Sequence, residues 1–291
     1  MHAEPFEYTH ADSVSHAIRL LEEIEDSQPL AGGQALIPLL KKRKIAPGTL
    51  IDISHLDELH GITRTDSGVR IGALSTHREI TNSNLLARLV PVLPAAISKI
   101  SGGIQVHNVA TIGGNIARAH PAYDYPGALR ASEARIHIAG PDGEQIVPAA
   151  EFFCGACKTC LGESQLVTAV EIDSWKQKRC GGYAKKKEPA SGGSVIGIAT
   201  DLLFEDADSS RVSEARIAAN GFQTHAVRIT AAEEALRGCI ITPETIESAA
   251  DAAGNDIDTD VILDNKKASA DYRKALLGPY VRRSLEKAIS N

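Results

Sequence analysis

The chain has 291 residues, a formal net charge of -6, and 43% hydrophobic and 23% charged residues. This composition is typical of a globular protein with one large domain or two. Its only dense basic runs are 41–44 and 185–187, so we do not expect a nucleic-acid partner.

The first residues lack the basic and then apolar pattern of a signal segment, and no apolar run approaches the ~20 residues that span a bilayer. We therefore expect a cytoplasmic protein without a membrane span. In a reducing compartment, clustered cysteines favour metal or redox roles over a disulfide framework.

The first half of the chain predicts alternating helices and strands. Apolar residues recur at helical spacing over 13–24, with Ser13 as the N-cap. Residues 28–44 read as a short strand, a Gly-Gly turn and a helix. Two strands are expected at 49–54 and 69–74, followed by one amphipathic helix over 85–100.

The second half begins with another Gly-Gly turn within 108–117 and a helix near Pro126, a residue tolerated in a first turn. A β-hairpin is expected over 134–149 and a strand over 165–172. Further along, we expect two strands within 179–204, a strand over 212–221, helices at about 230–237, 243–253 and 268–290, and a domain boundary near residue 178.

Both Gly-Gly pairs lie between apolar residues, in "AGGQALIPLL" from residue 31 and "TIGGNIA" from residue 111. A dinucleotide pyrophosphate needs backbone N–H donors and close approach, which glycine allows through positive φ and its missing Cβ. Neither segment has the Rossmann pattern G-x-G-x-x-G. Each alone also fits an ordinary tight turn, but the pair favours a dinucleotide site.

The segments "PLAGGQALIPLLKKRKIAPGTLIDIS" and "NVATIGGNIARAHPAYDYPGAL" together resemble the FAD-binding segments of a known family. It comprises the flavoprotein (medium) subunits of molybdenum hydroxylases, of the xanthine dehydrogenase, carbon monoxide dehydrogenase and quinoline oxidoreductase type. The resemblance covers nearly the whole chain and implies an α+β fold. A two-lobed FAD-binding domain of the vanillyl-alcohol oxidase type would occupy residues 1–178, with lobes of about 1–55 and 56–178. A small C-terminal domain of sheet and helices would occupy residues 179–291.

The resemblance also implies a role in electron transfer. FAD would take electrons from [2Fe–2S] clusters of a small partner subunit, while a large subunit with the molybdenum cofactor oxidises the substrate. The expected assembly is a dimer of heterotrimers, and the external acceptor is NAD⁺, a quinone, oxygen or a small carrier. Two alternatives are a self-contained flavin-dependent oxidoreductase on the same fold and a non-catalytic metal-binding or assembly module that uses the cysteines.

The residues expected to hold FAD follow from the resemblance position by position. Asp124 matches a carboxylate on the ribose or diphosphate side, with a helix N-cap as its alternative role. Leu166 and Lys185 match residues near the flavin ring, although Lys185 also fits a solvated member of the 185–187 run. The remaining residues form the first glycine segment (Ala31, Gly32, Gly33, Gln34, Ala35, Leu36 and Ile37) and the second (Thr111, Ile112, Gly113, Gly114 and Asn115).

The sequence departs from the family in two places. Residues 190–194 contain no aromatic side chain where the family often shields the flavin. Val106 and His107 replace part of a common Q-I-R-N pattern, and His107 reads as a supporting or surface residue. No Ser-His-Asp or paired-carboxylate arrangement is visible, which suits a subunit that leaves bond breaking to a partner.

Three cysteines form C-x-x-C-x-x-C at Cys154, Cys157 and Cys160. With Cys180 as a distant fourth ligand, they fit a [4Fe–4S] cluster, as in the 4-hydroxybenzoyl-CoA reductase branch of the family. In that branch, however, the cysteines lie in an inserted loop that this chain lacks. A four-cysteine zinc site and three free thiols in a loop remain the alternatives.

Overall fold

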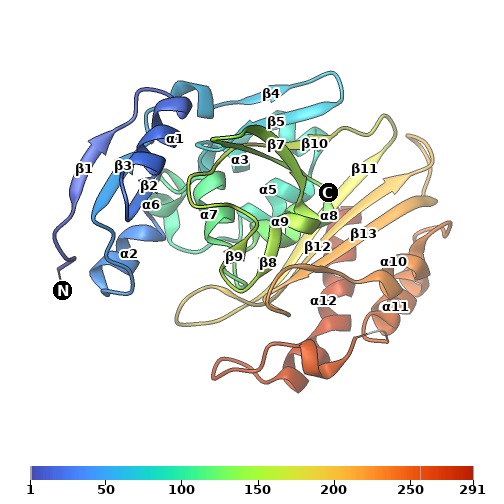
Figure 1. Cartoon of the computed structure of the whole chain (residues 1–291). Helices are drawn as coiled ribbons and strands as arrows, with labels where there is room; N and C mark the ends of the chain where they lie inside the picture. The colour runs from blue at the N-terminus through green and yellow to red at the C-terminus, as the bar shows by residue number, and fades with distance from the viewer. Residues whose placement is uncertain (1, 256, 291) are drawn as a thin grey trace.

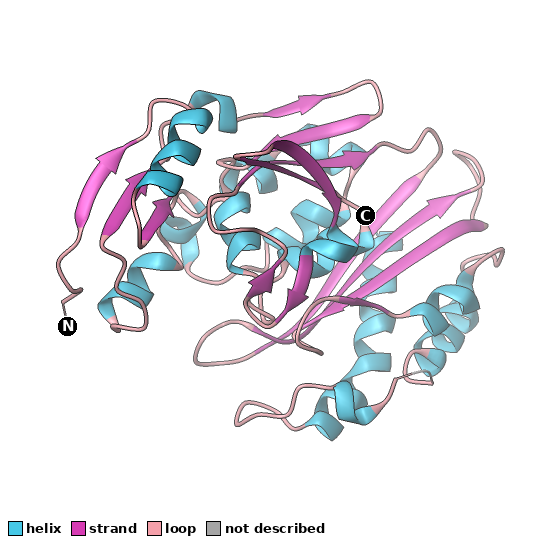
Figure 2. Ribbon diagram, in the orientation of Figure 1, coloured by secondary structure: helices cyan, strands magenta, loops and turns pink. Residues whose placement is uncertain are grey.

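The computed structural model describes residues 2–255 and 257–290. Figure 1 shows three main sheets in succession along the chain, with the first at the N-terminal end and the third beside the C-terminal helices, and a fourth sheet is a two-stranded hairpin. The ribbon in Figure 2 shows that helices accompany every sheet, so the fold is α+β as expected. None of the helices in the described ranges is long and apolar enough to cross a membrane.

The first sheet is parallel and has the strand order β1-β3-β2. Ser13 caps α1 through a bond from the His16 N–H to its hydroxyl, as predicted, and the apolar side of α1 packs in a small core with Ile51. The elements here are β1 (Glu7–His10), α1 (Val14–Glu23), β2 (Ser27–Leu30), α2 (Leu36–Lys41) and β3 (Thr49–Asp52).

The second sheet is antiparallel, with the strand order β4-β5-β10-β6-β7. Its strands are β4 (Ile62–Arg64), β5 (Gly68–Gly72), β6 (Arg135–Gly140), β7 (Gly143–Pro148) and β10 (Leu166–Asp173). A small hairpin of β8 (Phe153–Gly155) and β9 (Lys158–Thr159) lies before β10. The accompanying helices are η1 (Asp57–Leu59), α3 (His77–Asn82), α4 (Asn84–Leu89), α5 (Val92–Ile97), α6 (Gly103–His107), α7 (Ile112–Arg118), α8 (Tyr125–Ala131) and α9 (Ala149–Phe152).

The single helix expected over 85–100 was a wrong prediction, because the structure has α4 and α5 with a break at Val90 and Pro91. Val90 has φ -144° and ψ 61°, outside the helical region. The ring of a proline disfavours the helical conformation of the preceding residue, and Pro91 also lacks the N–H that would continue the helix. The apolar positions of both helices still face the core, since Leu86, Val92 and Leu93 are all buried.

The third sheet is antiparallel, with the strand order β11-β12-β13-β14, and α12 packs against it. A Cβ added at Gly182 in β11 would lie 2.2 Å from the Ser284 carbonyl oxygen, so the sheet and α12 approach closely there. The elements are β11 (Arg179–Lys187), β12 (Ser194–Phe204), β13 (Val212–Asn220), β14 (Val227–Arg228), α10 (Thr230–Leu236), α11 (Pro243–Ala252), η2 (Thr259–Val261) and α12 (Ala270–Ser290).

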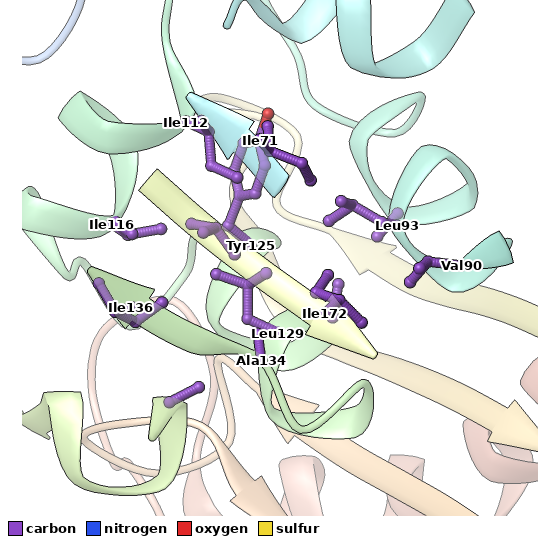
Figure 3. Close-up of a cluster of buried hydrophobic side chains, with 14 of the residues drawn as sticks. Ile71, Val90, Leu93, Ile112, Ile116, Tyr125, Leu129, Ala134, Ile136 and Ile172 are labelled. Atoms are coloured by element: carbon purple, nitrogen blue, oxygen red, sulfur yellow. The ribbon is translucent and has the colours of Figure 1, made fainter. Parts of the chain in front are cut away.

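The largest hydrophobic core lies between the second sheet and its helices. Figure 3 shows Tyr125 and Leu129 of α8 beside Ile71, Ile136 and Ile172 of the sheet. The same core also includes side chains from β11, β12 and β13. The second and third sheets are therefore joined by continuous packing, which fixes the loops that lie between them.

Candidate functional site

A cavity of about 780 Å³ lies where loops of all three sheets meet. The first glycine segment forms one wall, α7 and the second glycine segment form another, and the β11–β12 connection contributes the residues from Ser191 to Gly193. All of the residues expected at the FAD site line this cavity, except Ile37 and Ile112. The structure thus brings together positions that are more than 150 residues apart in the sequence.

The first glycine segment is an open turn between β2 and α2. Gly33 has a φ of 65°, which other residues rarely adopt, and Ile37 packs its side chain against this turn rather than facing the cavity. A Cβ at Gly32 would lie 2.0 Å from the Val109 carbonyl oxygen. Within the described ranges, the N–H groups from Gly32 to Ala35 donate to no protein acceptor. They are therefore free to donate to an anionic ligand in the cavity.

The second glycine segment is not the turn that we expected. Gly113 and Gly114 lie in the first turn of α7, where the Thr111 hydroxyl caps the helix by accepting the Gly114 N–H at 3.2 Å. Gly113 is needed for packing, because its added Cβ would lie 2.8 Å from the Ala73 carbonyl oxygen. Ile112 faces the hydrophobic core, which explains why it does not line the cavity.

One polar atom in the cavity wall is suited to contact a polar ligand. The side-chain oxygen of Asn115 is buried and, within the described part of the chain, has no hydrogen-bond partner. Leaving such an atom unpaired costs roughly 1–3 kcal/mol, so a polar ligand that donates to it would recover stability. This orphan acceptor and the free N–H groups of the first glycine segment fit a ligand with hydroxyl and phosphate groups.

Asp124 and Lys185 form a buried ion pair in the cavity wall. The Lys185 ammonium lies 2.7 Å from Asp124 Oδ2, and the Lys185 side chain is only 5% exposed. Asp124 Oδ1 accepts from the hydroxyls of Tyr183 at 2.5 Å and Ser194 at 2.7 Å. Burial and the adjacent carboxylate raise the pKa of Tyr183 well above its usual value, so Tyr183 stays a proton donor.

These contacts speak against the alternative roles of the two residues. Asp124 occupies the N-cap position of α8, but its side chain makes no capping bond there. Lys185 is held inside the wall and is not a solvated member of its basic run. Sequence reasoning did not find Tyr183 and Ser194, because no local motif marks a pairing with a residue 59 or 70 positions away.

His77 is a further cavity residue that sequence reasoning missed. Its ring is buried, its Nδ1 lies 3.0 Å from the Tyr125 hydroxyl, and the His107 ring contacts it edge-on. Burial, with a smaller effect of His107, lowers the pKa of His77 to about 3. His107 itself places Nε2 3.0 Å from the Ile100 carbonyl oxygen, consistent with the supporting role expected for it.

The loop between β11 and β12 closes one side of the cavity without an aromatic side chain. The Glu188 carboxylate accepts from the Ser191 hydroxyl and from the N–H groups of Ala190 and Ser191, which lowers the pKa of Glu188 to about 2. Ser101, between α5 and α6, donates to the Gly192 carbonyl at 3.1 Å and holds the loop against the helices of the second sheet. Leu166 at the start of β10 supplies apolar surface to the same cavity.

The four cysteines proposed as metal ligands lie in two separate parts of the structure. Cys154, Cys157 and Cys160 are exposed on the β8–β9 hairpin or next to it, whereas Cys180 lies in β11 and packs against the C-terminal core. In the described chain, no three of these sulfurs lie within 4.8 Å of one another, as a single zinc ion would require. The geometry therefore gives the four-cysteine site no support, and none of these residues lines the cavity.

Comparisons with known proteins assign both parts of the chain. Residues 4–175 match the FAD binding domain in molybdopterin dehydrogenase, and residues 183–288 match the CO dehydrogenase flavoprotein C-terminal domain. The carbon monoxide dehydrogenase medium chain of Hydrogenophaga pseudoflava is 34% identical over 97% of this chain and 96% of the relative. The xanthine dehydrogenase FAD-binding subunit of Escherichia coli O157:H7 is 26% identical over 97% of this chain and 96% of that subunit.

Solved structures agree with these matches. The carbon monoxide dehydrogenase of Hydrogenophaga pseudoflava is similar with a TM-score of 0.91 and 34% identity, over 100% of this chain and 99% of that chain. Quinoline 2-oxidoreductase of Pseudomonas putida 86 is similar with a TM-score of 0.90 and 26% identity, over 100% and 99% of the two chains.

Proposed function

We infer the function from one premise: this chain belongs to the FAD-binding medium subunits of the molybdenum hydroxylase family. It is an oxidoreductase flavoprotein subunit, as its relatives are. We propose that it binds FAD in the 780 Å³ cavity and passes electrons from iron–sulfur clusters of a partner subunit to an external acceptor. The observation that carries the proposal is that one cavity collects both glycine segments, Asp124 and Lys185.

The cavity offers distinct partners to the two ends of FAD. The free N–H groups from Gly32 to Ala35 would donate to the diphosphate, with Thr111 and Asn115 on the facing wall. Asp124 would lie on the ribose or diphosphate side, and Lys185 near the flavin ring, with Leu166 as an apolar contact. FAD supplies the reversible uptake and release of electrons when it is bound. The protein contributes the Lys185 ammonium as a hydrogen-bond donor, and the Asp124 carboxylate balances its charge.

The proposed partners follow from family membership. A small subunit with [2Fe–2S] clusters would deliver electrons, and a large subunit with the molybdenum cofactor would oxidise the substrate, in a cytoplasmic dimer of heterotrimers. The final acceptor would be NAD⁺, a quinone, oxygen or a small carrier. We do not include a [4Fe–4S] cluster in this chain, because Cys180 lies in the third sheet, whereas the other three cysteines lie on the β8–β9 hairpin or next to it.

The test compares the purified chain with the assembled complex. We expect the isolated chain to bind one FAD with a flavin absorption spectrum and to show no turnover with candidate substrates. Within the complex, substrate should reduce the flavin, and removing the iron–sulfur subunit should abolish that reduction. Asp124→Asn should weaken FAD binding, whereas Asp251→Asn, an exposed change in α11, should not.

Two results would favour the alternatives. Robust substrate oxidation by the isolated, FAD-loaded chain would identify a self-contained flavoenzyme. A chain that stays colourless after addition of FAD would point to a non-catalytic metal-binding or assembly module.

A further inference from the structure

Three side chains of metal-ligand type meet at one edge of the first sheet, outside the FAD cavity. His10 is the last residue of β1 and Asp52 the last of β3, and these residues are direct partners in the parallel register. His55 follows three residues after Asp52. Their ligand atoms all lie within 4.8 Å of one another, and within residues 2–255 and 257–290 no other such group was found.

Asp52 is held as the fixed member of this group. Its side chain is 10% exposed, its Oδ1 accepts the Ser54 N–H at 2.8 Å, and its Oδ2 accepts the Tyr8 hydroxyl. These two bonds fix the orientation of the carboxylate.

The two histidines are the accessible members. His10 Nδ1 lies 3.7 Å from Asp52 Oδ2, and 60% of the His10 side chain is exposed. The His10 and His55 rings meet edge-on, with centroids 5.3 Å apart. Exposed imidazoles can rotate by the small amount needed to bring their nitrogens to the ~2.0–2.1 Å that zinc–nitrogen bonds require.

We propose that His10, Asp52 and His55 bind one divalent transition-metal ion of the zinc class. Two imidazoles and one carboxylate suit such an ion, and three protein ligands leave a further position open to water. The ion would join the ends of β1 and β3. Asp52 also pairs in register with Leu30 of β2, the residue before the first glycine segment. A bound ion would therefore stabilise the sheet from which that segment extends. The proposal does not depend on FAD binding.

The test is calorimetric titration of Zn²⁺ into the purified full-length chain after treatment with a chelator. We expect one ion per chain, and a rise in the midpoint of thermal unfolding when zinc is added. His10→Gln and His55→Gln should each weaken zinc binding by at least about tenfold. Both residues are exposed, so these variants should fold normally. The matched control is His16→Gln, on α1 next to Asp12 and outside the group.

Two further results would overturn the proposal. One is the absence of zinc binding, or binding that His10→Gln and His55→Gln leave unchanged. The other is binding that is lost in a triple Cys154→Ser, Cys157→Ser, Cys160→Ser variant and kept in His10→Gln, because the ion would then be held by the exposed thiols.

Discussion

The ion pair of Asp124 and Lys185 sets the electrostatics of the cavity wall. Each partner is almost fully buried, and the remaining oxygen of Asp124 is occupied by the Tyr183 and Ser194 hydroxyls. Removing one member of a buried pair leaves the other charge without compensation, which costs more than the pair itself contributes. The pair is thus a point where a single substitution affects both stability and the site.

Lys185→Met should destabilise the FAD-free chain by about 3 kcal/mol, because the Asp124 carboxylate would stay buried without a cation. Urea denaturation of the two proteins measures this difference. Lys187→Met is the matched control, since Lys187 is exposed at the end of the same strand and should change stability by less than about 0.5 kcal/mol. Equal losses in both variants would show that Lys185 is not paired as the structure has it.

The buried His77 predicts a loss of stability in acid. Its pKa falls from an ordinary 6.5 to about 3 in the fold, so the unfolded chain binds more protons between these two values. The contribution of His77 is therefore neutral above pH 6.5 and becomes increasingly unfavourable as the pH falls toward 3. At pH 5 the cost is about 2 kcal/mol.

His77→Gln should flatten the dependence of unfolding free energy on pH between 6.5 and 3, while leaving carboxylate-driven changes in place. Denaturation curves at pH 7 and pH 5 for both proteins measure the effect. An unchanged slope in His77→Gln would mean that His77 is protonated within the fold.

The sequence predicts individual site residues, but it does not predict hydrogen-bond partners that lie far away along the chain. The resemblance located Asp124 and Lys185, and the structure places both on the cavity. Their partners Tyr183 and Ser194 carry no local signal, since the network joins α8 to two strands of another sheet. Whether these residues hold FAD stays a prediction that the binding experiment tests.

Elements were predictable where local chemistry decides them. α1 begins at a serine cap, the β6–β7 hairpin turns at residues 141–142, and Pro126 lies in the first turn of α8. The errors came from competition between signals. The apolar periodicity over 85–100 predicts one helix, although Pro91 breaks it between α4 and α5. The Gly-Gly pair at 113–114 predicts a turn, although Thr111 caps a helix there. The placement of Cys180 depends on strand pairing across sheets, which no local pattern reveals.

The first glycine segment predicts a specific loss on substitution. Gly32→Ala would bring a Cβ to 2.0 Å from the Val109 carbonyl oxygen and 2.9 Å from its carbon, and both are backbone atoms that cannot move aside cheaply. The turn must shift, and the unpaired N–H groups of this segment shift with it. We expect FAD affinity to fall by at least about tenfold, which corresponds to 1.4 kcal/mol or more.

Fluorescence titration of FAD measures the affinity of Gly32→Ala. Gly254→Ala is the control, because an added Cβ there meets no atom of residues 2–255 and 257–290 within 4 Å and its φ is not positive. Wild-type affinity in Gly32→Ala would show that the first glycine segment does not contact the cofactor, and the second segment would then have to carry the diphosphate.

The molecule as a whole forms the cavity only when its three sheets are assembled. The first sheet supplies the first glycine segment, the helices of the second sheet supply α7, and the third sheet supplies Lys185 and the β11–β12 connection. The shared hydrophobic core of the second and third sheets fixes the positions of their cavity walls relative to each other. A ligand that contacts every wall should therefore bind the folded chain alone and stabilise it as a unit.

FAD should protect three distant segments from amide hydrogen exchange at the same time: residues 31–36, 111–115 and 185–193. At a free concentration 100 times the dissociation constant, binding adds about 2.7 kcal/mol to the unfolding free energy. Because the ligand bridges the walls, opening any one wall would require releasing it, so their local openings become coupled. The α11 segment, Pro243–Ala252, lies outside the cavity and serves as the internal control for local protection. Protection confined to residues 31–36 would mean that the cofactor contacts one wall, and that the β11–β12 connection and Lys185 belong to the fold rather than to the site.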